Sequence, residues 1–119
     1  MVRAVRGAIQ VDRDEPADVL AGTRELLTEV LARNGIAPTD LISIVFTLTP
    51  DLTSCFPATA ARDLGLVDVP LLCATEVAVP GALPRVVRLL AHIESDRPRS
   101  AVRHVYLRGA TRLRPDLAA

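Results

Sequence analysis

Segments patterned like strands alternate with segments of helical periodicity along these 119 residues, which predicts one α/β domain over residues 1–119. Half of the residues are hydrophobic. They are mainly Val, Leu, Ile and Ala, because the chain has only two phenylalanines and one tyrosine. A chain of this length can bury a single core, and no repeat or linker divides it. We therefore expect a small sheet with helices packed on it around an aliphatic core.

The first half of the chain predicts a strand, a helix and a second strand. Residues 2–11 combine β-branched and small residues, as strands do. Asp14 is the expected N-cap of the helix that follows. Asn34-Gly35 is the expected end of this helix, since glycine readily adopts the left-handed conformation of helix C-termini. Residues 41–49, rich in Ile, Val and Phe, form the expected second strand.

The second half predicts a short helix over residues 58–64, ended by Gly65, and a third strand over residues 69–77. A fourth strand is expected over residues 102–107, followed by a short C-terminal segment. Between these two strands, apolar residues recur at helical spacing and predict an amphipathic helix. These residues are Leu83, Val86, Val87, Leu90 and Ile93.

Charge and targeting signals restrict the function. Fourteen arginines, with no lysine, balance fourteen acidic residues, so the formal net charge is zero. An even balance gives no electrostatic footprint for nucleic acid or for an anionic membrane, and we expect neither as a partner. No apolar stretch is long enough to span a membrane, and the first residues lack the pattern of a signal peptide. We therefore expect a cytoplasmic protein.

The familiar apparatus of metal or cofactor chemistry is missing from the sequence. His92 and His104 have no Cys or carboxylate at ligand spacing, and the six glycines form no phosphate-binding loop. Cys55 and Cys73 are expected to be free thiols, as is usual for two cysteines in a chain that is not exported. We expect no metal and no cofactor.

Two arginines lie inside apolar runs. Arg6 is flanked by Val5 and Gly7, and Arg88 by Val87 and Leu89. A permanently charged guanidinium is costly to bury without an anion. Few acidic residues lie near either position, so the expected partner is an external carboxylate or phosphate, which arginine binds with a planar fork of donors.

The candidate site consists of polar residues in apolar company: Arg6, Glu76, Arg88, Tyr106 and Arg114. The alternative is a purely structural network, with Glu76 paired to Arg88 or Arg6 and Tyr106 as a core residue. Cys73 likewise has two interpretations. It is either a small buried hydrophobic residue or a thiol that faces a ligand.

Several short motifs follow one another along the chain: Val5-Arg6-Gly7-Ala8, Thr49-Pro50-Asp51-Leu52, Phe56-Pro57-Ala58, Ala61-Arg62, Cys73-Ala74-Thr75-Glu76, Arg88, Arg103-His104-Val105-Tyr106-Leu107 and Leu113-Arg114-Pro115-Asp116-Leu117. Their order closely resembles the monofunctional chorismate mutases of the Bacillus type. The resemblance covers nearly the whole chain with little change in spacing.

This resemblance implies a homotrimer of α/β subunits around a barrel-like core, with active sites between neighbouring subunits. It also implies a cofactor-free rearrangement of chorismate to prephenate. Arg88 would reach the ether oxygen of the breaking bond and the side-chain carboxylate. Arg6 would bind that carboxylate and Tyr106 would donate to it. Glu76 would accept a hydrogen bond from the ring hydroxyl, with Cys73 close by.

Further residues would surround the substrate. They are Phe56 and Ala58 on an apolar wall, Arg62 and Arg114 as positive charges at the mouth, and Leu113 as a cover. The chain departs from the family at Thr59, where a lysine is common. This removes a cation that would help to hold the ring carboxylate, and Arg62, one helical turn away, is the residue that could replace it.

Two other functions remain open from the sequence. A trimeric imine deaminase of similar architecture also holds a carboxylate with an arginine between subunits, but it gives no role to the spacing of Glu76 and Arg88. A non-catalytic trimer that senses a carboxylated metabolite is favoured only by Thr59. An absorbance assay of chorismate disappearance distinguishes the mutase from both.

Overall fold

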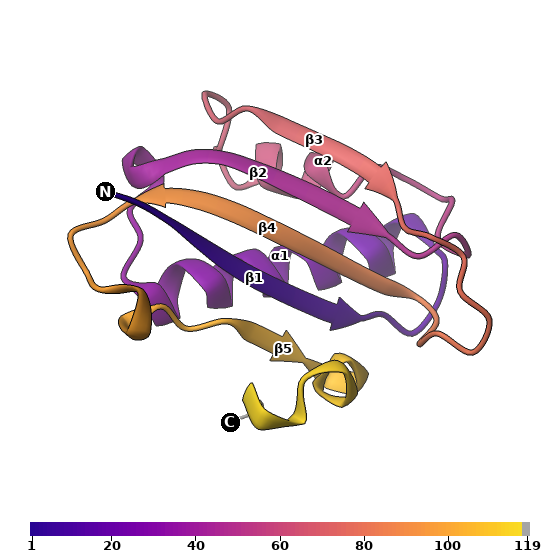
Figure 1. The fold of residues 1–119 in the computed structure, drawn as a ribbon. Coiled ribbons are helices and arrows are strands. Elements are labelled where there is room, and N and C mark those ends of the chain that lie inside the picture. The colour runs from indigo at the N-terminus through magenta and orange to yellow at the C-terminus, as the bar shows by residue number, and fades with distance from the viewer. Residues whose placement is uncertain (118–119) are drawn as a thin grey trace.

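Five strands form one mixed sheet in the computed structural model, which describes residues 1–117 (Figure 1). In chain order these strands are β1 (Val2–Gln10), β2 (Leu41–Leu48), β3 (Leu71–Thr75), β4 (Val86–Glu94) and β5 (Val105–Leu107). Across the sheet the order is β3-β2-β4-β1-β5. β4 is antiparallel to β1 and β2, whereas β3 is parallel to β2 and β5 is parallel to β1. The expected small mixed sheet with packed helices is confirmed.

Two α-helices, α1 (Pro16–Asn34) and α2 (Ala58–Asp63), lie on one side of this sheet, behind it in Figure 1. Alternate residues of each central strand point toward these helices, as the two-residue period of a strand requires. They form the aliphatic core with the apolar side of α1. Fully or almost fully buried members of this core include Val5, Ile9, Leu26, Val30, Phe46 and Leu89.

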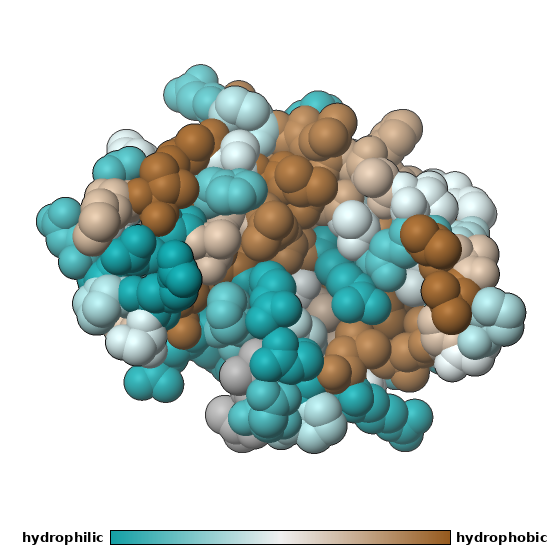
Figure 2. Space-filling view, viewed as in Figure 1, coloured by the Kyte–Doolittle hydropathy of each residue, from teal (hydrophilic) through white to brown (hydrophobic). Residues whose placement is uncertain are grey.

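The other side of the sheet, here called the open face, is turned to the viewer in Figure 1 and carries no α-helix of residues 1–117. The short 3-10 helices η3 (Arg108–Leu113) and η4 (Pro115–Leu117) lie beside it at the β5 edge. Figure 2 shows this face from the same direction, with hydrophilic side chains interrupting the apolar surface near its middle. The remaining turns include η1 (Pro38–Asp40) and η2 (Arg99–Ala101).

The expected end of the first helix is confirmed, but its expected N-cap is wrong. Gly35 follows the helix with φ of 59°. At the other end the N-cap is Glu15, without a side-chain cap bond. The carboxylate of Asp14 instead accepts hydrogen bonds from the backbone N–H groups of Thr53 and Ser54, both at 3.1 Å. Asp14 thus holds the loop before α2, and the bond from Thr53 lowers the pKa of its carboxyl.

The helix expected through Leu83 and Ile93 is wrong, because residues 86–94 form β4, the central strand of the sheet. β4 carries apolar residues on both faces, since Val86 and Leu90 lie on the open face while Val87 and Leu89 reach the core. Some of them then fall at helical spacing by coincidence. The β4 side chains that reach the core follow a period of two instead: Val87, Leu89, Ala91 and Ile93. The predicted third and fourth strands are confirmed but are shorter than expected.

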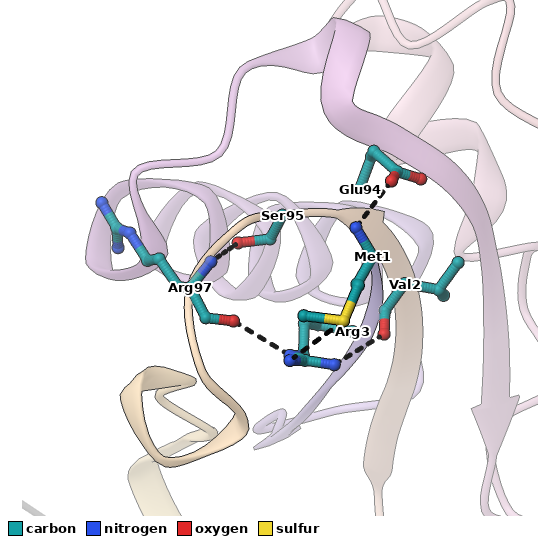
Figure 3. Close-up of polar contacts among 6 residues, drawn as sticks. All are labelled: Met1, Val2, Arg3, Glu94, Ser95 and Arg97. Carbon is teal, nitrogen blue, oxygen red and sulfur yellow. Dashed lines mark hydrogen bonds and ion pairs between the residues drawn. The ribbon is translucent and has the colours of Figure 1, made fainter.

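The N-terminus is tied to the far end of β4 (Figure 3). The amino group of Met1 lies 2.9 Å from Oε1 of Glu94. The Nε of Arg3 donates to the carbonyl of Arg97 at 3.0 Å, and the N–H of Arg97 donates to Oγ of Ser95. These contacts fix the start of β1 against β4. No helix within residues 1–117 is long and apolar enough to cross a membrane.

Candidate active site

One row of residues crosses all five strands on the open face. The strand register aligns them in the order Ala74, Thr47, Arg88, Ala8 and Tyr106. Ala8 has only a methyl group, so space remains between the long side chains of Arg88 and Tyr106. Arg6 lies two residues before Ala8 and therefore points to the same face. The sheet thus brings Arg6, Arg88 and Tyr106 together from three neighbouring strands.

Glu76 follows β3 and meets Arg88 across the end of β2. The Nε of Arg88 lies 3.1 Å from Oε2 of Glu76. The same carboxylate oxygen accepts a hydrogen bond from the hydroxyl of Thr47 at 2.6 Å. The backbone N–H of Glu76 donates to the carbonyl of Leu48 at 2.8 Å, so both the backbone and the side chain of Glu76 are fixed. This is the pairing that a purely structural network predicted.

The pair leaves part of the guanidinium of Arg88 available. Its Nε is inaccessible to solvent, and its N–H is not aligned well enough with Glu76 for a hydrogen bond. The side chain as a whole is nevertheless 43% exposed, against 16% for Glu76. The exposure of Arg88 therefore belongs to other atoms than Nε. The Nε contacts Glu76, while other atoms of the Arg88 side chain are accessible to a ligand.

Arg88 lines two adjoining pockets. The first, of about 290 Å³, is here called the arginine pocket and is lined mainly by Arg6, Val45, Thr47, Arg88, Leu90 and Tyr106. It contains two guanidinium groups and no carboxylate. The second, of about 340 Å³, includes Asp51, Glu76, Leu83 and Arg88. Pockets of this size suit a small ligand, and the two arginines favour a ligand with carboxylate groups.

The end of the row at β5 is closed by residues near the C-terminus. Leu113 packs against the cluster that contains Ala8 and Tyr106. Arg114 pairs with Asp116 at 2.9 Å, and this contact lowers the pKa of Asp116 and raises that of Arg114. Leu113 and Arg114 thus lie near Tyr106.

His104 supports the backbone of Arg6. The N–H of Arg6 donates to Nδ1 of His104 at 2.9 Å. Burial lowers the pKa of His104, and the nearby charges of Arg6 and Arg114 lower it further. The unprotonated nitrogen that the hydrogen bond requires is therefore favoured. Sequence reasoning considered His104 only as a metal ligand and missed this contact, because it depends on the pairing of β1 with β5.

Sequence reasoning also missed Thr47 as a residue of the candidate site. Its signal is present in the sequence, since Phe46 and Leu48 are the buried neighbours that turn Thr47 to the opposite face. A polar residue at such a position in a central strand needs a partner, and here that partner is Glu76.

Five predicted site residues are not brought to the open face of this chain. Cys73 packs against the core on the helix side, and Ala58 is buried in the same core. Thr59 and Arg62 lie on α2, which covers that side. Phe56 precedes α2 and is 71% exposed. Within one chain, these residues and the arginine pocket therefore belong to opposite sides of the sheet.

The described residues contain no metal-binding cluster and no disulfide. Among residues 1–117, no three or more His, Cys, Asp or Glu side chains lie close enough to hold a metal ion. Cys55 and Cys73 are both free thiols, and burial raises the pKa of Cys55.

Comparisons with known proteins agree with one another. Residues 2–117 match the family model described as chorismate mutase type I. The chain is 57% identical to Chorismate mutase AroH of Thermus thermophilus over 98% of its own length and 97% of that protein. It is 39% identical to Chorismate mutase AroH of Bacillus subtilis (strain 168), over 99% and 94% of the two chains. A solved chorismate mutase from Clostridium thermocellum superposes with a TM-score of 0.90 at 41% identity, covering 91% of this chain and 96% of that one.

Proposed function

The chain belongs to the type I chorismate mutase family and catalyses the rearrangement of chorismate to prephenate, and we propose that the substrate binds on the open face, at Arg88. The observation that carries this proposal is the position of Arg88, which lines both pockets and is held from behind by Glu76. A ligand at Arg88 has Arg6 and Tyr106 on one side and Glu76 on the other.

The rearrangement requires few reactive groups from the protein. In this pericyclic step an ether C–O bond breaks while a C–C bond forms within one molecule, and no proton or electron enters or leaves. The enzyme has to hold the flexible dianion in its compact conformer, with the reacting carbons close together. It also has to stabilise the negative charge that builds on the ether oxygen, because bond breaking runs ahead of bond making.

Arg88 is suited to stabilise the negative charge on the ether oxygen. Its guanidinium is already fixed by Glu76 before the substrate arrives, so little reorganisation is needed as charge develops. The part of the group that stays exposed offers donors in one rigid plane. We assign it to the ether oxygen and the side-chain carboxylate.

The remaining polar groups orient the substrate. Arg6 and the hydroxyl of Tyr106 bind the side-chain carboxylate within the arginine pocket. Oε2 of Glu76 already contacts Thr47 and Arg88, so we assign Oε1 to the ring hydroxyl. Arg114 adds positive potential at the mouth and Leu113 covers the ligand, which their contacts near Tyr106 support.

The other predicted residues reach the substrate only from a second copy of the chain, and we propose a homotrimer with sites between protomers. Phe56, Ala58, Thr59, Arg62 and Cys73 then come from the neighbour. Two observations support association through the β3 side. β3 is an edge strand, and Leu72 on it is 63% exposed. The unpaired N–H and C=O groups of an edge strand can pair with another chain.

The position where the family commonly has a lysine then lies in the part of the site that the neighbouring protomer supplies. Thr59 leaves no cation at its own position, and we propose that Arg62, on the same helix, serves the ring carboxylate instead. We further propose that residues 1–119 act as one domain and that the enzyme works in the cytoplasm, as expected for a biosynthetic enzyme.

The decisive test of this site follows chorismate absorbance with the purified wild-type protein and the Arg88→Ala variant. The wild type consumes chorismate, and the variant is expected to be slower by roughly a hundred- to a thousandfold. A variant that keeps nearly full activity would place the reaction elsewhere in the molecule.

A further inference from the structure

Arg85, directly before β4, adopts a backbone conformation that costs energy. Its φ is 55°, in the left-handed region that residues with a Cβ avoid. Strain of this kind persists only where surrounding contacts hold it in place. The backbone N–H of Arg85 donates to both carboxylate oxygens of Asp51, at 2.9 and 3.2 Å. Its side-chain Nε donates to the carbonyl of Val11 at 3.0 Å.

Asp51 also holds the end of β2. Its Oδ1 accepts the hydroxyl of Thr49, and the same hydroxyl oxygen accepts the N–H of Val86 at 3.0 Å. The backbone N–H of Thr49 donates to the carbonyl of Val86 at 3.0 Å. One carboxylate therefore ties the end of β2 to the start of β4. The motif Thr49-Pro50-Asp51-Leu52 has no other role in the site described above.

Along the chain, Arg85 lies between the two charged residues of the site, Glu76 and Arg88. The loop of residues 77–84 begins after Glu76, whose N–H is fixed to the carbonyl of Leu48, and ends at Arg85. It forms most of the wall of the 340 Å³ pocket, which Asp51 also lines. Arg85 directly precedes β4 and Arg88 is the third residue of that strand, so we expect a change at Arg85 to shift the first residues of β4 against β2.

We propose that Asp51 is a positioning residue that holds Arg85 in its strained conformation and thereby sets Arg88 opposite Glu76. This rests on the roles proposed above for Arg88 and Glu76. Without Asp51, Arg85 relaxes toward an ordinary conformation and the loop moves with it. The guanidinium of Arg88 is then displaced from the developing charge, which lowers kcat more than it changes KM.

The test compares three variants with the wild type by chorismate kinetics. Asp51→Ala is expected to lower kcat by about 100-fold with a change in KM below about fivefold. The Asp51→Ala/Arg85→Gly variant should recover at least about tenfold of that loss, because glycine adopts this φ without an anchor. If Asp51 acted only on stability, kcat per folded enzyme would be unchanged in Asp51→Ala and the glycine would have no loss to recover. Asp40→Asn is the control, since Asp40 also accepts a backbone N–H, that of Ala37, but lies at η1.

Two results overturn the proposal: a kcat of Asp51→Ala within about threefold of wild type, or a double variant no more active than Asp51→Ala. If Asp51→Ala does not fold, Asp51→Asn measures the same effect. It keeps one acceptor oxygen and should lower kcat by about tenfold, and a loss below about twofold counts against the proposal.

A third comparison separates this proposal from the role of Arg88. In an Arg88→Ala background, removing Asp51 should lower kcat by no more than about threefold further, because the group that Asp51 positions is gone. A full additional loss in that background overturns the positioning role alone. An Arg88→Ala variant that is itself nearly as active as wild type instead overturns the proposed site.

Discussion

Arg88 and Glu76 stand on the open face with Nε and Oε2 3.1 Å apart, and Thr47 of the intervening strand donates to the same carboxylate oxygen. The contact sets the orientation of a guanidinium whose Nε is buried and whose side chain is 43% exposed. A cation held in this orientation can stabilise negative charge that develops during a reaction without first reorienting. The following predictions depend on this arrangement and on the fold that creates it.

Replacing Arg88 separates its charge from its geometry. Arg88→Ala should lower kcat by roughly a hundred- to a thousandfold, since one donor to the developing charge is lost. Arg88→Lys keeps the charge but not the planar fork, so its activity should lie between those of Arg88→Ala and wild type. Arg33→Ala is the matched control, because Arg33 pairs with Glu29 on the surface of α1. Turnover of Arg88→Ala within about tenfold of wild type contradicts the prediction.

The pH profile of turnover should be nearly flat between about pH 6 and pH 9, because the rearrangement transfers no proton and arginine side chains keep their charge across this range. The measurement is kcat at saturating chorismate in buffers of constant ionic strength. A bell-shaped profile with both limbs inside this window would indicate general acid–base catalysis and would be incompatible with the mechanism.

Sites shared between protomers predict complementation. Phe56→Glu places a negative charge on the proposed wall and should repel the dianionic substrate, while Arg88→Ala removes the central cation. Each variant alone should be nearly inactive. After joint unfolding and refolding, mixed trimers contain some sites with both halves intact, and activity should reappear. The same mixture prepared without subunit exchange is the control, and a mixture no more active than the sum of its parts would rule out shared sites.

His104 should make stability depend on pH. Its folded-state pKa is lowered from 6.5, so the unfolded chain binds the proton more readily than the folded one. The free energy of unfolding should therefore fall as the pH drops below about 6.5 and should level off below the folded-state pKa. Urea unfolding, repeated between pH 5 and pH 8 in steps of about 0.5 pH unit, measures this free energy of unfolding. His104→Gln cannot titrate, and an unchanged pH dependence in that variant would assign the effect to another group.

Asn34 joins the end of α1 to the segment before β5. Its amide donates to the carbonyls of Val30 and Arg103, each at 2.9 Å, and its oxygen accepts the N–H of Arg103 at 2.8 Å. Asn34→Ala removes all three bonds, leaves the part-buried backbone N–H of Arg103 without its partner and should cost about 3 kcal/mol of unfolding free energy. Thr28→Ala on the same helix provides the comparison. A loss below about 0.5 kcal/mol would show that water replaces these bonds.

Local patterns predicted most of the fold. The first strand, the helix ending at Gly35 and the strand rich in Ile, Val and Phe are all confirmed, because each presents a clear periodicity or a glycine in a left-handed conformation. The segment around Arg88 was the exception. Its periodicity was ambiguous because a central strand is apolar on both faces, and only its pairing with β1 and β2 decides between helix and strand.

The amino-acid sequence by itself determined the chemistry of this protein: an aliphatic α/β core and a small set of arginines, with Glu76 and Tyr106, in apolar surroundings. Tertiary structure decided how these groups meet. The strand arrangement placed Thr47 on the strand between Glu76 and Arg88. It also brought His104 within hydrogen-bonding distance of the backbone N–H of Arg6, and it packed Cys73 against the core on the helix side. The reason is physical: a residue's neighbours in sequence report whether it is buried, whereas its partners come from strands distant in the chain, whose adjacency no local pattern records.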